Sequence, residues 1–119
     1  MEREKALEIL KKYVKNDFYI THSLAVEAIM RKLATKLAPN DIELWGIAGL
    51  LHDLDEECSN WQEDMSFHGP KSVEILKEEG FGNDIIYNAI LAHNPLNGKK
   101  AKTDIEYALL AADPMSGFI

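Results

Sequence analysis

The amino-acid sequence predicts an all-α fold, a single-domain bundle of five or six main helices. Apolar residues recur at the three- and four-residue spacing of a helix through nearly all of the 119 residues. No segment alternates apolar and polar residues as a strand does, and we find no internal repeat. The length suits one compact domain, residues 1–119, and a hydrophobic content of 46% suffices for a core.

The first two helices are predicted over residues up to Val14 and over residues 18–37. Asn16 and Asp17 interrupt the first helix and start the second, and Pro39 follows the end of the second. The second helix is amphipathic, so its apolar residues are expected to contact the core. These expected core contacts are Leu24, Ala28, Met30, Leu33 and Leu37.

The third helix is predicted over residues 41–54, because Asn40 with Glu43 three residues later is typical of a helix start. This helix is apolar on most faces, which indicates a central, buried position. Gly46 and Gly49 inside it each cost about 1 kcal/mol relative to alanine. We therefore expect a neighbouring helix to approach closely at these glycines.

The last three helices are indicated by their start signals. Pro70 stands at the first position of a helix predicted over residues 70–79. Asn83 is the expected cap of a helix over residues 84–93, and Thr103 with Glu106 forms the capping box of a sixth helix. The segment 55–66 has mixed charge and no clear period, which indicates a loop or a short irregular helix.

Charge and composition disfavour several classes of partner. A net charge of −7 disfavours double-stranded nucleic acid, whose binding depends on neutralising phosphates, and it disfavours anionic membrane surfaces. The charged N-terminal segment has no apolar signal core, and no apolar run is long enough to span a bilayer. We therefore expect a cytoplasmic protein. Its one cysteine, Cys58, allows no internal disulfide and has no pattern of a catalytic nucleophile around it.

All four histidines of the chain fall into one ordered series with two aspartates. Imidazole and carboxylate are ligands that divalent transition metals prefer. A single histidine is more often a packed residue than a ligand, but the order of the whole set favours a metal site, which distant helices would assemble. Such ligands suit one or two ions of Fe, Mn, Co, Ni or Zn, and the sequence does not choose among these metals. The series is His22, His52-Asp53, His68, His93 and Asp113.

The motifs around these residues resemble the HD superfamily of metal-dependent phosphohydrolases over residues 18–119. His52-Asp53 lies within Gly-Leu-Leu-His-Asp-Leu-Asp, and Asp113 lies within Ala-Ala-Asp-Pro. His68, followed by Gly-Pro, and His93 are similar to the extra ligands of the two-metal branch. That branch includes bacterial HD-type dinucleoside tetraphosphate hydrolases and cyclic-dinucleotide phosphodiesterases. The resemblance implies an HD-type helical bundle.

The resemblance also implies a ligand assignment, with Asp53 bridging two ions. The first ion would be held by His22, His52, Asp53 and Asp113. The second would be held by Asp53 with His68 and His93, although both histidines could instead bind substrate or act as acid and base around one ion. We favour two ions, which can activate water without a protein nucleophile.

The implied activity is hydrolysis of a phosphoester or phosphoanhydride in a small nucleotide-like substrate. Asp53, His68 and Lys71 are the candidate catalytic residues. Many family members follow His-Asp with a hydrophobic residue, Gly and a phosphate-contacting Lys, whereas this chain has acidic residues at the last two positions. Lys71 could replace that contact, as could three lysines of the loop after His93, which are more simply explained as a solvated run. These lysines are Lys99, Lys100 and Lys102.

Two other functions remain open from the sequence: a non-catalytic metal-containing sensory or scaffolding domain, and oxygen chemistry at a di-iron centre. Trp61 is the better candidate for a substrate-binding wall, whereas Trp45 is expected in the core. The subgroup of predicted HD hydrolases that this sequence also resembles continues past Ile119, so the chain could be a shortened form. The apolar Phe118-Ile119 could pack on the core or on a partner in an oligomer.

Overall fold

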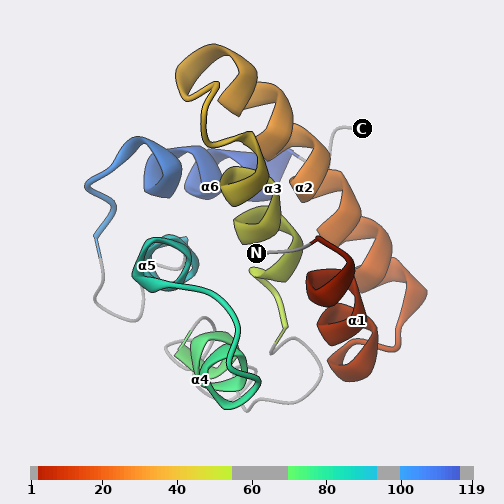
Figure 1. The fold of residues 1–119 in the computed structure, drawn as a ribbon. Helices are drawn as coiled ribbons and strands as arrows, with labels where there is room; N and C mark the ends of the chain where they lie inside the picture. The colour runs from red at the N-terminus through yellow and green to blue at the C-terminus, as the bar shows by residue number, and fades with distance from the viewer. Residues whose placement is uncertain (1–2, 55–69, 94–99, 116–119) are drawn as a thin grey trace.

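The computed structural model describes residues 3–54, 70–93 and 100–115, and these residues form α-helices and no strand (Figure 1). The prediction of an all-α fold is therefore confirmed for this part of the chain. The helices are α1 Arg3–Tyr13, α2 Asp17–Leu37, α3 Ile42–Leu51, α4 Pro70–Glu78, α5 Asp84–Ala92 and α6 Asp104–Met115.

Helix α3 lies at the centre of the array, with α2 along one side and α5 on the other, while α6 crosses behind α3 and also packs against α2 (Figure 1). It packs against α1, α2, α5 and α6, and its most extensive contact is with α2. Every residue from Trp45 to Leu51 is buried, because this helix is apolar on all its faces. The predicted central position of α3 and the core position of Trp45, which is 3% exposed, are both confirmed.

The core-facing side of α2 differs from the predicted one. Met30 is buried and Leu33 is partly buried, as expected, but Leu24, Ala28 and Leu37 are exposed. The residues that α2 buries against α3 recur at helical spacing, but two of them are polar. A prediction based only on apolar residues therefore chose the wrong face of this helix. Its buried residues are Ser23, Val26, Glu27, Met30 and Ala34.

The two glycines of α3 lie where α2 approaches, as predicted. A Cβ atom added to Gly46 would lie 2.5 Å from Nε of Arg31, and one added to Gly49 would lie 2.9 Å from Cγ of Met30. Contacts this short do not occur between real Cβ atoms and their neighbours, so side chains here would force a shift. The absence of side chains at both glycines therefore leaves room for side chains of α2 against α3.

Most helix starts follow the predicted caps. The side chain of Asn16 accepts a hydrogen bond from the N–H of Phe18, and that of Asn83 accepts one from the N–H of Ile86. Thr103 accepts from the N–H of Glu106 at 3.4 Å, but the Glu106 carboxylate accepts from Lys102 one residue further back, so the capping box is only half formed.

The predicted start of α3 is wrong by one residue. Asp41, not Asn40, is the N-cap, and its side chain makes no capping hydrogen bond. Glu43, which the capping box would have used, instead pairs with Nη1 of Arg31 at 3.0 Å, across the contact between α2 and α3.

A buried carboxylate connects the first two helices. Oε2 of Glu27 accepts a hydrogen bond from Nε of Arg3 at 2.6 Å, and Oε1 accepts one from Nη2 of Arg3 at 2.9 Å. Nε of Arg31 donates to the same carboxylate at 3.0 Å. The Glu27 side chain is 6% exposed, whereas those of Arg3 and Arg31 are 42% and 26% exposed. The two guanidinium groups therefore compensate the buried charge of Glu27.

Replacing Glu27 by Ala is expected to lower the free energy of unfolding by about 2 kcal/mol. This is less than the roughly 3–5 kcal/mol for a fully buried pair, because water can reach both arginines. The matched control is Glu43→Ala, which removes a half-exposed partner of Arg31 and should cost less than about 1 kcal/mol. Urea unfolding of both variants tests the expectation, and equal losses would contradict it.

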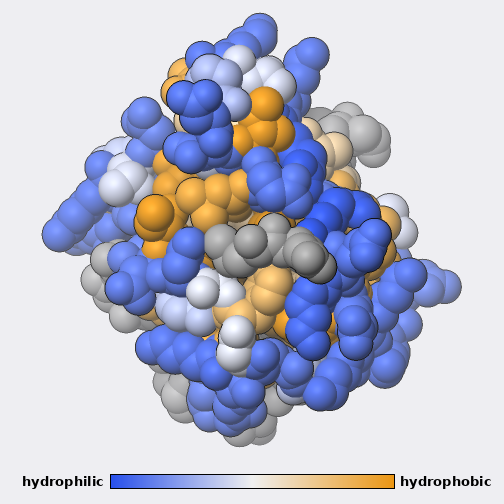
Figure 2. All heavy atoms as spheres, in the orientation of Figure 1, coloured by the Kyte–Doolittle hydropathy of each residue, from blue (hydrophilic) through white to orange (hydrophobic). Residues whose placement is uncertain are grey.

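The face of the molecule in Figure 2 is largely hydrophilic, and apolar side chains gather near the middle of the view, over α3 and α6. Among the described residues, no helix is long and apolar enough to cross a membrane. The buried apolar residues form one core cluster, which includes residues of α3.

Candidate metal centre

Four predicted ligands converge at the C-terminal end of α3. His22 comes from α2, His52 is the C-cap of α3, Asp53 follows it in a turn, and Asp113 comes from α6. Each of the four offers a ligand atom, and these atoms all lie within 4.8 Å of one another. The contacts of α3 with α2 and α6 therefore assemble the cluster, as the sequence predicted for ligands on distant helices.

The imidazole Nε2 atoms and the carboxylates of the cluster face one another. Nε2 of His22 lies 2.8 Å from Oδ1 of Asp113 and 3.2 Å from Oδ2 of Asp53. Nε2 of His52 lies 3.2 Å from the same Asp53 oxygen and 3.3 Å from the same Asp113 oxygen. Two nitrogens and two oxygens thus alternate around one small space, which is a donor set that suits a divalent transition metal.

Backbone carbonyls orient two of the histidine rings. His52 and His93 are the C-caps of α3 and α5, and the Nδ1 of each ring lies against the carbonyl oxygen three residues earlier. Nδ1 of His52 donates to the carbonyl of Gly49 at 2.6 Å, and Nδ1 of His93 donates to that of Ile90. Both rings therefore present Nε2 to the cluster, and the partial negative charge of two helix C-termini favours a cation there.

His93 faces a different oxygen of the Asp53 carboxylate from the one that His22 and His52 face. Its Nε2 lies 3.6 Å from Oδ1 of Asp53, and its ring packs edge-on against that of His52 with 5.1 Å between centroids. Oδ2 of Asp53 faces His22 and His52. The two oxygens of this one carboxylate therefore face different histidines.

The cluster shifts the proton affinity of its members. Hydrogen bonds to Asp113 and then Asp53 raise the pKa of His22 from 6.5 to about 9, against the effects of burial and of His52. Full burial lowers the pKa of His52, but the two carboxylates outweigh burial and raise it well above 6.5. Burial alone would raise the pKa of Asp113, but hydrogen bonds to the two histidines lower it well below the usual range. In the metal-free protein, His22 and His52 therefore hold a second ring proton at neutral pH, between the carboxylates of Asp53 and Asp113.

Metal binding is consequently expected to release protons and to strengthen as the pH rises. A ligand imidazole must give up its Nε2 proton, and His22 retains that proton below a pKa of about 9. Below that pH the apparent affinity should rise with pH by up to about tenfold per pH unit for each proton displaced, and it should level off only where both His22 and His52 have lost that proton. Calorimetric titration in buffers of different ionisation enthalpy counts these protons. An affinity that does not change between about pH 6 and pH 8 would contradict the expectation.

Three of the predicted site residues, His68, Trp61 and Lys99, lie outside the described residues, so their predicted roles stay predictions. Cys58, for which no catalytic role was predicted, also lies outside them. Lys71, at the start of α4, is 41% exposed in its side chain and lies 3.5 Å from Glu74 on the same helix.

The remaining loop lysines lie at the surface. Lys100 and Lys102 are exposed, and the backbone N–H of Lys102 donates to Glu106. Their exposure agrees with a solvated run, which is the simpler explanation of these lysines.

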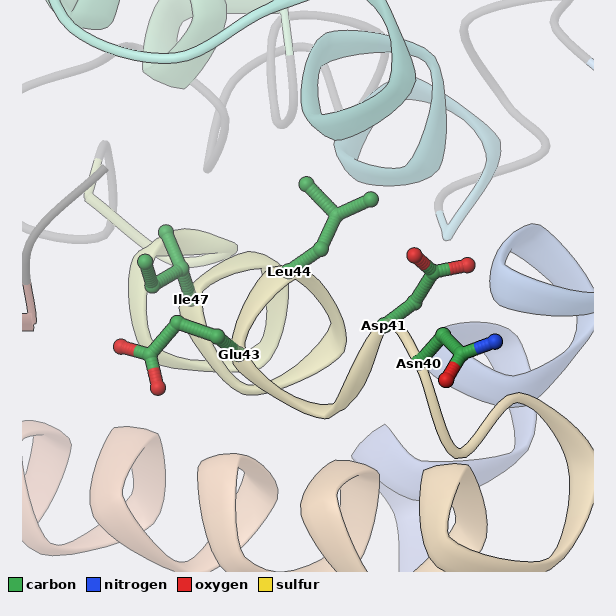
Figure 3. Close-up of a pocket in the computed structure, with 5 residues that line it drawn as sticks. All are labelled: Asn40, Asp41, Glu43, Leu44 and Ile47. Atoms are coloured by element: carbon green, nitrogen blue, oxygen red, sulfur yellow. The ribbon is translucent and has the colours of Figure 1, made fainter.

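A pocket of about 210 Å³ lies at the other end of α3 from the cluster. Figure 3 shows Leu44 and Ile47 on α3 and the acidic Asp41 and Glu43 around it; Asn40 completes the lining. Asp41 and His52 are separated by the length of α3, about 15 Å for ten residues. A lining with two carboxylates and no cation does not suit a phosphorylated substrate, so this pocket is not the predicted active site.

The chain matches the model of the HD domain family over residues 19–113. The match begins three residues before His22 and ends at Asp113, so it contains the whole cluster. Comparisons with curated proteins and with solved structures gave no significant match. Because the family match covers most of the chain, and because its histidines and aspartates meet in one cluster, this protein belongs to the HD domain family.

Proposed function

We propose that this protein is a metal-dependent phosphohydrolase that hydrolyses a phosphoester or phosphoanhydride bond of a small nucleotide-like compound. The observation that carries the proposal is the cluster of two imidazoles and two carboxylates whose ligand atoms lie within 4.8 Å of one another. Membership of the HD domain family supports a metal-dependent hydrolase function in general terms. The substrate class and the role of each residue are part of the proposal.

The residues of the cluster fit a divalent transition metal. Asp53 and His52 are buried, and a buried carboxylate is costly unless a cation or proton compensates it. Nδ1 of His52 donates a hydrogen bond to the carbonyl of Gly49, so Nε2 is the ring atom that could bind an ion. We assign the first ion to the four residues His22, His52, Asp53 and Asp113.

We assign a second ion to the side of Asp53 that faces His93. Oδ1 of Asp53 and Nε2 of His93 are 3.6 Å apart, and each would supply one ligand atom. His68 is the remaining proposed ligand and lies outside the described residues. Asp53 would then contribute to holding both ions.

When bound, divalent ions activate water as a nucleophile and stabilise the charge that develops on a phosphoryl group. The chain itself would orient these ions through fixed Nε2 atoms and hold Asp53 and Asp113 as carboxylates. In this proposal His68 acts at the centre as ligand or acid, and Lys71 contacts substrate phosphate. The Lys71 side chain is partly exposed on the first turn of α4.

The test is turnover by metal-depleted protein after addition of Mn²⁺, Co²⁺ or Fe²⁺. A panel of bis(p-nitrophenyl) phosphate, nucleotides and dinucleotides is incubated with each metal, and products are separated by chromatography. Metal-dependent release of phosphate or of a nucleotide supports the proposal. Full metal loading with no turnover on any compound would favour a sensory or scaffolding domain, and an oxidised product formed only with iron and oxygen would favour di-iron chemistry.

A further inference from the structure

Gly49 contacts the backbone of α2 one turn before the metal cluster. A Cβ atom at this position would lie 3.0 Å from the carbonyl oxygen of Val26 and 3.1 Å from Cα of Glu27. Backbone atoms of a packed helix cannot rotate away as a side chain can, so α2 itself would have to move by a few tenths of an ångström. Gly49 therefore sets how closely α2 approaches the last turn of α3.

The same residue also holds a ligand ring. Its carbonyl oxygen accepts the hydrogen bond from Nδ1 of His52 at 2.6 Å. His52 is fully buried, so this bond fixes which ring nitrogen remains for the cluster. Gly49 thus contacts α2, which carries His22, and the imidazole of His52.

We propose that Gly49 is a positioning residue of the metal centre: its missing side chain brings His22 of α2 against the His52-Asp53 pair, and its carbonyl aims Nε2 of His52. This inference rests on the metal site proposed above. The imidazole rings of His22 and His52 lie 5.2 Å apart between centroids. The Nε2 atoms of both rings face the same two oxygens, one of Asp53 and one of Asp113. A shift of α2 relative to α3 changes the distances from His22 and leaves those within the His52-Asp53 pair unchanged.

Gly46 supplies a matched control at the same helix interface. A Cβ atom there would meet Nε of Arg31 at 2.5 Å, which belongs to a partly exposed and flexible side chain. Its three nearest neighbours are all side-chain atoms of Arg31, with Cγ at 2.8 Å, and none is a backbone atom of α2. Gly46→Ala would therefore displace the Arg31 side chain, whose guanidinium bonds Glu27, before it displaces the α2 backbone. Gly46 also precedes His52 by six residues, about 9 Å along the helix.

The experiment compares the full-length parent, Gly49→Ala and Gly46→Ala by titration of the metal-depleted proteins with Co²⁺. The dissociation constant and the visible absorption spectrum of bound Co²⁺ are measured, together with unfolding of the metal-free proteins. We expect Gly49→Ala to bind Co²⁺ about tenfold more weakly, with an altered spectrum. Mutation of a group that orients a metal ligand typically lowers metal affinity by about 10–100-fold. Gly46→Ala should lose stability but bind Co²⁺ within about twofold of the parent.

Three outcomes would overturn the inference. If Gly49→Ala binds like the parent, α2 positioning does not limit the site. If both variants weaken binding equally, the effect is general loosening of the interface. If the parent itself binds no Co²⁺, the proposed metal site fails and this inference fails with it, which the parent titration distinguishes from the first two. The role of the Gly49 carbonyl is tested by ¹⁵N NMR of the zinc-loaded protein, which should show His52 coordinated through Nε2. Coordination through Nδ1 would contradict that role.

Discussion

Replacing Asp53 by Ala is expected to abolish metal binding and reduce hydrolysis to the uncatalysed background. Both oxygens of this carboxylate face histidine Nε2 atoms, Oδ2 toward His22 and His52 and Oδ1 toward His93. The loss of affinity should therefore exceed the roughly 10–100-fold that follows removal of a supporting group behind a ligand.

Metal content by elemental analysis and thermal unfolding with and without metal measure this effect. In the parent, an ion present at about 100 times its dissociation constant adds roughly 2.7 kcal/mol of stability, and the variant should lose this gain. Asp41→Asn is the matched control, because it removes an exposed carboxylate at the other end of α3 that makes no capping bond. If the Asp53 variant retains full metal stabilisation, the cluster is not the metal site.

The helices themselves were predictable because apolar spacing and caps are local properties of the chain. Proline at the start of α4 and Asn83 before α5 placed two helix starts correctly. The face that α2 buries was not predictable in the same way. That face includes Glu27, whose charge is compensated by Arg31 one turn later on α2 and by Arg3 of α1. The first pair has local i,i+4 spacing, but the second joins two helices and cannot be read from a local pattern.

The cluster was predictable as a set of residues but not in its geometry. The ordered histidines and aspartates indicated the ligands, and the structure places four of them together. The prediction that the third helix continues to residue 54 hid the fact that α3 ends at Leu51, which makes His52 its C-cap. The carbonyl of Gly49 was missed for this reason, and that of Ile90 was missed because the fifth helix was predicted to include His93, which is its C-cap. A histidine one position past a helix end is nevertheless a usable signal for such a bond.

Replacing His93 by Ala is expected to remove about one metal equivalent and leave the first ion in place. The His93 ring faces Oδ1 of Asp53, whereas His22 and His52 face Oδ2, so its loss should affect only the second ion. Turnover should fall strongly, because charge on the phosphoryl group would then be stabilised by one ion instead of two.

Elemental analysis and a Co²⁺ titration that resolves two steps measure the stoichiometry for this variant and for His68→Ala. The His93 ring also packs on His52, so the affinity of the first step must be compared with that of the parent to detect indirect damage. An unchanged first step with a missing second step supports two ions. If both variants bind as much metal as the parent while turnover falls, one ion is bound, and these histidines act instead on the substrate as ligands or as acid and base.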